Sequence, residues 1–280
     1  MTKIIHDIDA IHREKIELLR SNLGIRTNLF FNAASGIVEF KESCVAINTP
    51  SCREYYFGNY LVLYRQPADK DFEALQSLFA AQVAHDARVE HSVFVWSADQ
   101  TAPLEIARFL ASGYSYVTET ALLAKPEDLS APAPLDSRFS IRKYAGGGDW
   151  EQWYALQMEG KEVVQDNEKY HAYLRHLQAT YLTLIEQDRG AWWGAFHGDE
   201  QIGNLGLFFD GDTGRFQSVY TKEKYRNRGI CRALLAAAAS DAWGRASRLI
   251  IVADDDYYAL ALYEKMGFKV AHKLASLCKA

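Results

Sequence analysis

Apolar runs separated by turn-forming residues predict a series of β-strands after residue 138. The runs are residues 139–144, 190–198, 201–211 and 214–221. Gly- and Asp-rich breaks, "GDE" and "DGDTG", separate the last three runs, as hairpin turns require. We therefore expect these three strands to form an antiparallel meander.

Helical spacing of apolar side chains alternates with these strands. One face of a helix starting near Asn167 would carry Tyr170, Leu174, Leu177, Tyr181 and Leu184. An Ala/Leu-rich run predicts a helix over 229–243, and the apolar run 248–253 predicts a buried strand. The segment 257–267 predicts a last helix ended by its glycine, before a closing strand over 268–277.

Another helix is predicted where Asp149 and Gln152 resemble a capping box. The preceding "AGGGDW" is similar to a phosphate-binding loop. However, no Lys-Ser/Thr pair follows it, and Asp149 would repel phosphate. We interpret this stretch as a flexible loop that leads into a capped helix.

The predicted order after residue 138 is β-α-α-β-β-β-α-β-α-β, which indicates a mixed α+β class. A helix that joins two neighbouring strands requires a crossover, so the strands at 214–221 and 248–253 should pair in parallel. Upstream, residues 125–137 hold three of the six prolines, and this composition is typical of an exposed connector. We predict a lobe over 1–128, a linker over 129–137 and a second domain over 138–280.

Charge and cysteine usage exclude several classes of function. The formal net charge is −5 with acids and bases interspersed, which argues against a nucleic-acid partner. The N-terminus lacks an apolar signal core, and no apolar run reaches the ~18 residues of a membrane span. No HExxH motif occurs, and no zinc or disulfide spacing relates Cys44, Cys52, Cys231 and Cys278. We expect a cytoplasmic protein with reduced thiols, no metal and no membrane partner.

A basic segment leads directly into the Ala-rich helix. Gly229 stands at the helix start, among Arg226, Arg228 and Arg232. The first N–H groups of a helix have no partner within the helix and carry partial positive charge, so they bind phosphate well. Gly229 would let the backbone approach such an anion closely. On spacing alone, an ordinary helix start with a solvated basic face is an equal alternative.

Two motifs in this region resemble those of the GNAT superfamily of N-acetyltransferases. The stretch "YRNRGICRALL" resembles the family's acyl-CoA loop, Gln/Arg-x-x-Gly-x-Gly/Ala, with Cys231 where Gly or Ala is usual. Downstream, "DYYALALYEKMGFKV" is similar to the family's "NxxAxxLYxxxGF" helix, with Asp256 in place of the usual asparagine. The resemblance covers about residues 138–280 and agrees with the predicted strand order. In that fold, strands four and five splay apart and admit the thioester.

The resemblance implies which residues bind acetyl-CoA. Backbone groups of Val219, Tyr220 and Thr221 would pair with the pantetheine arm, and one such N–H would polarise the thioester carbonyl. The diphosphate site would comprise Arg226 and the N–H groups of Asn227, Arg228, Gly229, Ile230, Cys231 and Arg232. Asp256 would contact the cofactor or simply cap its helix.

The resemblance also implies a catalytic acid, whereas the base stays open. Tyr263 would protonate the departing thiolate, although helix periodicity alone favours a packing role for it. Many relatives carry a glutamate on the fourth strand, where this chain has Gln217. The remaining base candidates are Asp254, Asp255, His197 or a water chain; alternatively, the amine binds already neutral.

The first half of the chain contains a faint repeat of the second. "FLASGYSYVTETALLAK" at 109–125 is similar in layout to 263–280, with Gly113-Tyr114 corresponding to Gly267-Phe268. A helix over 69–87 and a strand over 91–97 are expected upstream. We interpret this half as a degenerate GNAT-like lobe without a cofactor loop. An unrelated α/β domain is the alternative.

The expected fold is therefore two GNAT-like lobes in tandem, each a mixed, mostly antiparallel twisted sheet flanked by helices. The expected function is transfer of an acetyl group from acetyl-CoA to an amine of a small molecule or peptide by direct attack. The alternative is a non-catalytic acyl-CoA-binding or sensor protein.

Overall fold

The computed structural model describes residues 10–86, 88–99, 103–129, 134–159, 167–256 and 259–280. Contacts between Cα atoms divide the chain into two compact units. Unit 1 comprises residues 1–121, 253–257 and 271–280, and unit 2 comprises 122–252 and 258–270. Among the residues that the structure describes, none of the helices combines the length and apolar character needed to cross a bilayer.

The sheet of unit 2 has the predicted mixed topology. Its strands are β6 (Phe139–Lys143), β7 (Gly190–His197), β8 (Glu200–Asp210), β9 (Thr213–Thr221) and β10 (Arg248–Asp254). Their order is β10-β9-β8-β7-β6. Strands β7, β8 and β9 form an antiparallel meander, β6 pairs antiparallel with β7, and β10 pairs with β9 in parallel. The meander and the parallel pair confirm what the sequence pattern predicts.

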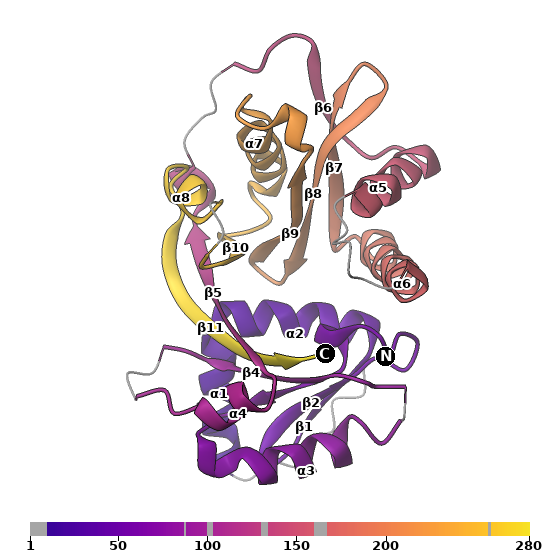
Figure 1. The fold of residues 1–280 in the computed structure, drawn as a ribbon. Helices are drawn as coiled ribbons and strands as arrows, with labels where there is room; N and C mark the ends of the chain where they lie inside the picture. The colour runs from indigo at the N-terminus through magenta and orange to yellow at the C-terminus, as the bar shows by residue number, and fades with distance from the viewer. Residues whose placement is uncertain (1–9, 87, 100–102, 130–133, 160–166, 257–258) are drawn as a thin grey trace. The chain divides into compact units, whose positions relative to one another are not determined.

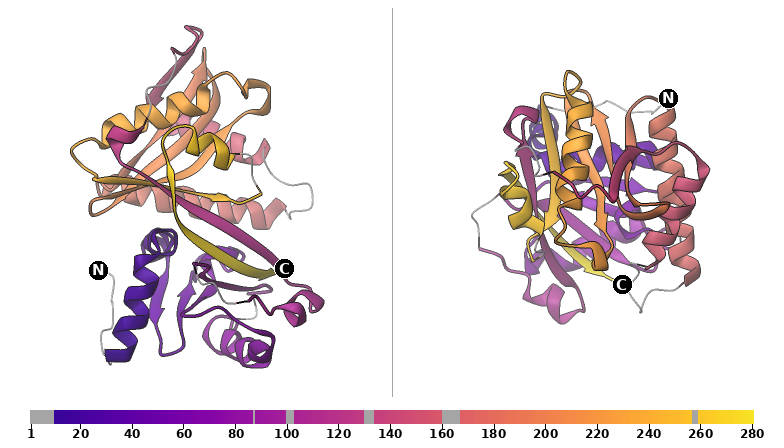
Figure 2. Two further views of the ribbon diagram at one scale, coloured as in Figure 1. Left: turned by 90° about the vertical axis from the view of Figure 1, so that its left-hand side faces the viewer. Right: turned by 90° about the horizontal axis from the view of Figure 1, so that it is seen from above.

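Helices cover both faces of this sheet, as Figures 1 and 2 show. Helices α5 (Gly147–Glu159) and α6 (Asn167–Glu186) lie on one face, and α7 (Ile230–Ala242) lies on the other. A short helix, α8 (Ala259–Glu264), follows β10. The α5–α6 face is packed with aromatic rings: Trp153, for example, meets both Trp192 and Tyr181 edge-on.

The start of α5 differs from the predicted capping box. Asp149 lies inside the first turn and is held by a bidentate ion pair with Arg142 (2.7 and 2.8 Å) and by the N–H of Ala145. Gln152 instead accepts a hydrogen bond from the N–H of Gln201 on β8. Hydrogen bonding to Arg142 lowers the pKa of Asp149, so this carboxylate stays charged. Tertiary partners on β6 and β8 therefore replace the local reciprocal bonds.

Unit 1 contains strands in the order β1-β2-β3-β4-β11. Its strands are β1 (Ile37–Phe40), β2 (Cys44–Asn48), β3 (Tyr60–Leu63), β4 (Ser92–Ser97) and the end of β11 (Lys269–Lys279). Its helices are α1 (Ala10–Ser21), α2 (Leu23–Ser35), α3 (Phe72–Gln82) and α4 (Ala107–Ala111). Another strand, β5 (Ser115–Ala124), contributes residues to both units.

The C-terminal strand completes the sheet of unit 1. Residues 274–279 of β11 pair antiparallel with 92–97 of β4. The contacts therefore assign the last ten residues, 271–280, to unit 1, and assign 122–128 to unit 2. The boundaries 1–128, 129–137 and 138–280 differ from this division, because a boundary read along the chain cannot detect a strand that returns to an earlier sheet. The three predicted boundaries stay a prediction.

Leu277→Ala should therefore destabilise unit 1, although the residue lies three positions from the C-terminus. Leu277 is fully buried in a core with Phe94 and Trp96, so its truncation should lower the free energy of unfolding by about 2–5 kcal/mol. Lys269→Ala, an exposed change on the same strand, is the control. Denaturation combined with amide exchange should show the loss of protection in β1–β4. Loss confined to β7–β9 would contradict the assignment.

The sequence repeat has the same local geometry in both units. Gly113 and Gly267 both have positive φ, at 88° and 108°, and both follow a helix. The next residue, Tyr114 or Phe268, donates its N–H to the carbonyl five positions back, at Phe109 or Tyr263 respectively. Each pair of rings also packs edge-on. Phe109 thus occupies in unit 1 the place of Tyr263 in unit 2, without its hydroxyl.

The start of α3 in unit 1 is closed to anions by its own carboxylates. Asp71 accepts the N–H of Ala68 and pairs with Arg65, and hydrogen bonding to Arg65 lowers the pKa of Asp71. Asp69 accepts the N–H of Arg108. These negative charges repel phosphate from a helix start that would otherwise attract it.

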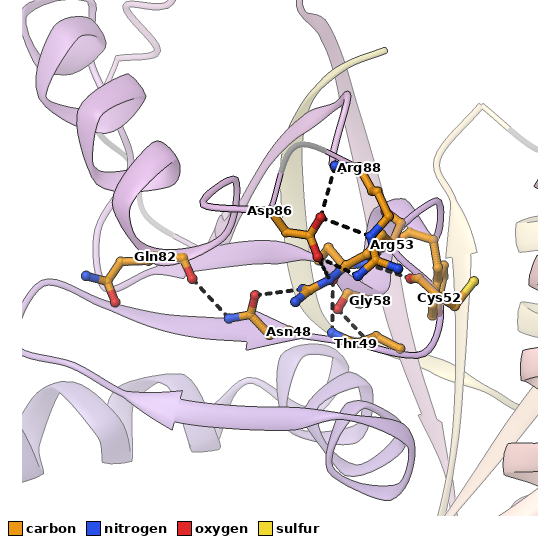
Figure 3. Close-up of polar contacts among 10 residues, drawn as sticks. Asn48, Thr49, Cys52, Arg53, Gly58, Gln82, Asp86 and Arg88 are labelled. Carbon is orange, nitrogen blue, oxygen red and sulfur yellow. Dashed lines mark hydrogen bonds and ion pairs between the residues drawn. The ribbon is translucent and has the colours of Figure 1, made fainter.

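A buried arginine fixes the loop between β2 and β3 of unit 1 (Figure 3). Arg53 donates to Asn48 and Asn59 at 3.2 and 3.1 Å and pairs with Asp86 at 3.1 Å. Arg88, which is exposed, shares the same carboxylate. The polar side chains of this loop therefore satisfy one another, which is typical of a structural network.

Candidate active site

Strands β9 and β10 separate soon after they begin to pair. Only Thr213, Gly214 and Arg215 of β9 are in register with β10, opposite Arg248, Leu249 and Ile250. Within the described chain, residues 216–221 of β9 have no partner on β10. The two parallel strands therefore open toward their C-terminal ends, and backbone groups of β9 become available along that opening.

A bulge in β9 lies beside this opening. Asn204 of β8 pairs with Tyr220, whereas Gly206 pairs with Gln217, so Ser218 and Val219 stand opposite a single residue of β8. Ser218 has a φ of 49°. A bulge interrupts the regular ladder and redirects backbone N–H groups. Val219 is thus part of the bulge, Tyr220 and Thr221 follow it to the end of the strand, and all three are half-buried.

The loop after β9 delivers the chain to α7 in a left-handed conformation. Asn227 and Gly229 have φ values of 61° and 79°. Gly229 is the N-cap, and no side chain caps the helix. The N–H groups of residues 229–232 have no acceptor among the residues that the structure describes. An unfilled donor set at a helix start fits a diphosphate.

The positive charge around this loop is only partly neutralised. Arg226, Arg228 and Arg232 are exposed, and neither Arg228 nor Arg232 forms an ion pair within the described chain. By contrast, Lys222 and Lys224 both bind Glu200, at 3.1 and 3.0 Å. These lysines and Tyr225 lower the pKa of Glu200 to about 2. Arg228 and Arg232 therefore leave positive charge beside the loop that an incoming anion can meet.

Cys231 does not add negative charge to the loop. Burial raises the pKa of its thiol to about 12, so the side chain is neutral at physiological pH. A neutral, small side chain is compatible with phosphate at this position, where Gly or Ala is usual in the family that the motif resembles.

Comparisons with known proteins bear on this geometry. The model of the "Acetyltransferase (GNAT) family" matches residues 150–268, which contain the divergent strands, the loop and α8. Residues 150–268 are thus a GNAT-family domain. A comparison of the sequence with curated proteins gave no match.

Solved structures extend the likeness to both units. A functionally unknown conserved protein from Staphylococcus epidermidis is 13% identical with a TM-score of 0.70, covering 85% of this chain and 91% of its own. A GCN5-related N-acetyltransferase from Kribbella flavida is 13% identical with a TM-score of 0.62, covering 91% and 94%. A tandem GNAT protein from the clavulanic acid biosynthesis pathway is 11% identical with a TM-score of 0.54, covering 78% and 72%. At these identities the likeness establishes the fold, which is the predicted tandem of GNAT-like lobes.

Tyr263 is linked to the opening of the GNAT domain through two aromatic contacts. Its ring, 5% exposed, packs edge-on against Phe268 at 6.2 Å, and Phe268 packs on Phe216 at 6.1 Å. Phe216 is the first residue of β9 beyond the pairing with β10. The packing role that helix periodicity indicates is therefore real, and it holds Tyr263 beside the divergent strands. Its role as an acid stays a prediction.

The hydrogen bond that the structure shows for Asp256 lies within its own loop. Asp256 is exposed and groups by contacts with unit 1, and its N–H donates to the carboxylate of Asp254. Residues 257 and 258, with which α8 was expected to begin, lie outside the described residues. Neither the capping role nor the cofactor contact is decided for Asp256.

The side chains proposed as a base are each engaged elsewhere. Burial raises the pKa of Asp255, but hydrogen bonds from Lys273 and Thr120 outweigh it and leave the pKa below its usual value. Asp254 is exposed, and its carboxylate accepts a hydrogen bond from the N–H of Asp256 in the same loop. His197 is exposed at the end of β7, with Nδ1 3.2 Å from the hydroxyl of Tyr225. These contacts therefore identify none of the three side chains as the catalytic base.

Gln217 takes part in a contact that sequence reasoning missed. Its amide donates to the hydroxyl of Tyr181 on α6 at 3.3 Å, and burial raises the pKa of this tyrosine. The helical spacing predicts that Tyr181 faces the sheet but cannot indicate which strand residue it meets. The bulge likewise had no sequence signal, because neither Ser218 nor Val219 is a glycine.

Proposed function

We propose that the GNAT domain transfers the acetyl group of acetyl-CoA to an amine. The observation that carries the proposal is the separation of β9 from β10 after three residue pairs, directly before a helix start with unfilled N–H donors. The opening suits an extended pantetheine arm, and the helix start suits a diphosphate. Acetyl-CoA would supply an activated acyl group and a thiolate leaving group.

In this proposal, residues of the domain bind acetyl-CoA, polarise its thioester carbonyl and protonate the departing thiolate. Backbone groups of Val219, Tyr220 and Thr221 pair with the pantetheine arm, and an N–H beside the bulge polarises the thioester carbonyl. The neutral amine forms a bond to the acyl carbon as the carbon–sulfur bond breaks. The amine gives its surplus proton to solvent, and Tyr263 donates a proton to the thiolate.

Calorimetry with acetyl-CoA and a thiol-release assay test the two halves of this proposal. We expect binding of acetyl-CoA and release of free thiol with at least one amine from a panel of small amines, amino acids and short peptides. Absence of binding at millimolar acetyl-CoA would remove the proposal altogether.

A second candidate function, a non-catalytic acyl-CoA sensor, is favoured by one set of observations. β9 carries Gln217 where many relatives have an acid, and the alternative bases are bound by other groups. The same two assays separate the candidates, since a sensor binds acetyl-CoA but releases no thiol with any amine. As further expectations, the protein is cytoplasmic and uses neither nucleic acid nor a membrane as a partner.

A further inference from the structure

The side chain of one buried asparagine of the GNAT domain has no hydrogen-bond partner in the part of the chain that the structure describes. Asn204 on β8 is fully buried, and neither its side-chain oxygen nor its side-chain nitrogen has a partner among the described residues. Leaving a buried amide without partners is costly, and native proteins usually avoid it. This amide is therefore a candidate for contact with a polar ligand.

The other buried asparagines show how unusual this is in the described chain. Asn22, Asn32, Asn48 and Asn59, all in unit 1, each use both the oxygen and the nitrogen of the side chain in hydrogen bonds. Figure 3 includes one of them, Asn48, between Arg53 and the carbonyl of Gln82. Asn204 therefore differs from buried asparagines with a structural role.

The neighbours of Asn204 explain why its amide is left without a partner. Cross-strand pairs share a face of the sheet, and Asn204 is paired with Gly194 on β7 and Tyr220 on β9. The next position on the same face of β8 is Gly206. Two of these three neighbours have no side chain to offer a hydrogen bond.

This face is the one that α5 and α6 cover, beside the bulge. A side chain at Gly206 would meet Trp192, which packs against Trp153 of α5. Gln217, the partner of Gly206 across β9, bonds to Tyr181 of α6. Tyr220 and Gln217, which pair with Asn204 and Gly206 across β9, are both partly exposed.

We propose that Asn204 binds the acceptor and selects an amine with a carbonyl group next to the nucleophilic nitrogen, as in an amino-acid amide or a peptide N-terminus. The side chain offers one acceptor oxygen and a donor NH₂, so a ligand that satisfies it must present a donor and an acceptor together. An α-amino amide does this, whereas a simple alkylamine presents nitrogen alone. This inference rests on the proposed acetyl transfer.

Matched pairs of amines test the inference. Leucinamide and isoamylamine share one side chain and differ in the carboxamide, as do phenylalaninamide and 2-phenylethylamine. An α-amino amide is a weaker base than an alkylamine and is more often neutral at pH 7, so the amide-to-alkylamine ratio of kcat/KM in thiol release is compared between the wild-type protein and a variant. This ratio should be at least about tenfold lower in Asn204→Leu than in the wild-type protein, because leucine leaves the carboxamide of the bound amine without a hydrogen-bond partner. The ratio is internal to each variant, so it does not depend on how much folded protein is present.

A stability comparison separates ligand binding from a structural role. Replacing an unpartnered buried amide with an apolar side chain of similar shape should leave Tm unchanged or raise it. Asn59→Leu, which removes an asparagine with every bond filled, should lower Tm and serves as the matched control. A lower Tm for Asn204→Leu would indicate that the amide holds an internal water, and would overturn the proposal.

The possible outcomes distinguish this inference from the proposed function. Thiol release with equal kcat/KM for amides and plain amines overturns the inference and leaves acetyl transfer standing. An amide-to-alkylamine ratio that is the same in Asn204→Leu as in the wild-type protein also overturns it. No thiol release with any amine means that the proposed function has failed first. Should Asn204→Leu not fold, Asn204→Ala provides the same ratio.

Discussion

Gly229→Val should abolish measurable binding of acetyl-CoA, with a rise in Kd of roughly 100-fold or more. Gly229 has a φ of 79°, which a β-branched residue adopts only under strain. Nothing lies within 4 Å of a Cβ at this position, so the effect would come from the backbone and not from crowding. A loop forced to negative φ would redirect the first N–H groups of α7. Losing two charge-assisted bonds at ~1.5–3 kcal/mol each accounts for the expected change in Kd.

Gly244→Val provides a matched control on the same helical segment. Gly244 follows the C-terminus of α7 with a φ of 78°, and a Cβ added there would also meet open space. Both substitutions therefore impose a similar backbone strain, but only one is at the proposed diphosphate site. Calorimetry should give an unchanged Kd for Gly244→Val and similar losses of Tm for both variants. Equal affinities in the two variants would remove the diphosphate site from this loop.

Tyr263→Phe should lower kcat about 100-fold and leave the Kd for acetyl-CoA unchanged. General acid catalysis contributes roughly 10²–10⁴-fold, and removing the hydroxyl removes the proposed proton donor to the thiolate. Phenylalanine preserves the ring that packs on Phe268, so the fold should be retained.

A second Tyr→Phe substitution, in unit 1, controls for the loss of a buried hydroxyl. Tyr114→Phe removes a hydroxyl that bonds to Gln76 and Ser92, far along the chain from the GNAT motifs. It should lower Tm without changing kcat. A Tyr263→Phe variant with normal kcat and a lower Tm would instead assign Tyr263 to packing. Unit 1 already carries Phe109 at the equivalent turn, which is consistent with a hydroxyl needed in only one lobe.

The order of elements after residue 138 could be predicted because its signals are local. Helical spacing identified α6, the Ala-rich run identified α7, and the turn residues separated β7 from β8 and β9. In the first half, the helix at 69–87 and the strand at 91–97 correspond to α3 and β4. Helices α1 and α2 and strands β1 to β3 were not predicted.

In the candidate site, too, the features that lie within short motifs could be predicted from the sequence, and the long-range contacts could not. The glycine at the start of α7, the arginines around it and Tyr263 are visible in the sequence, because each lies within a short motif. The polar contact between Tyr181 and Gln217 joins residues 36 positions apart, and no local pattern encodes it. The predicted capping box at Asp149 was wrong for a related reason, since partners on other strands outcompeted the local bond.

The sequence by itself determined the elements of the GNAT domain, the loop that begins α7 and the residues that resemble the family's motifs. Only the tertiary structure decided that residues 274–279 pair with β4, that β9 bulges at Ser218, and that Asn204 is buried without a partner. The physical reason is the range of the interactions. Propensity, capping and turn chemistry act over a few residues, whereas strand pairing and burial depend on segments that can lie more than 170 positions apart, as Cys278 and Val93 do.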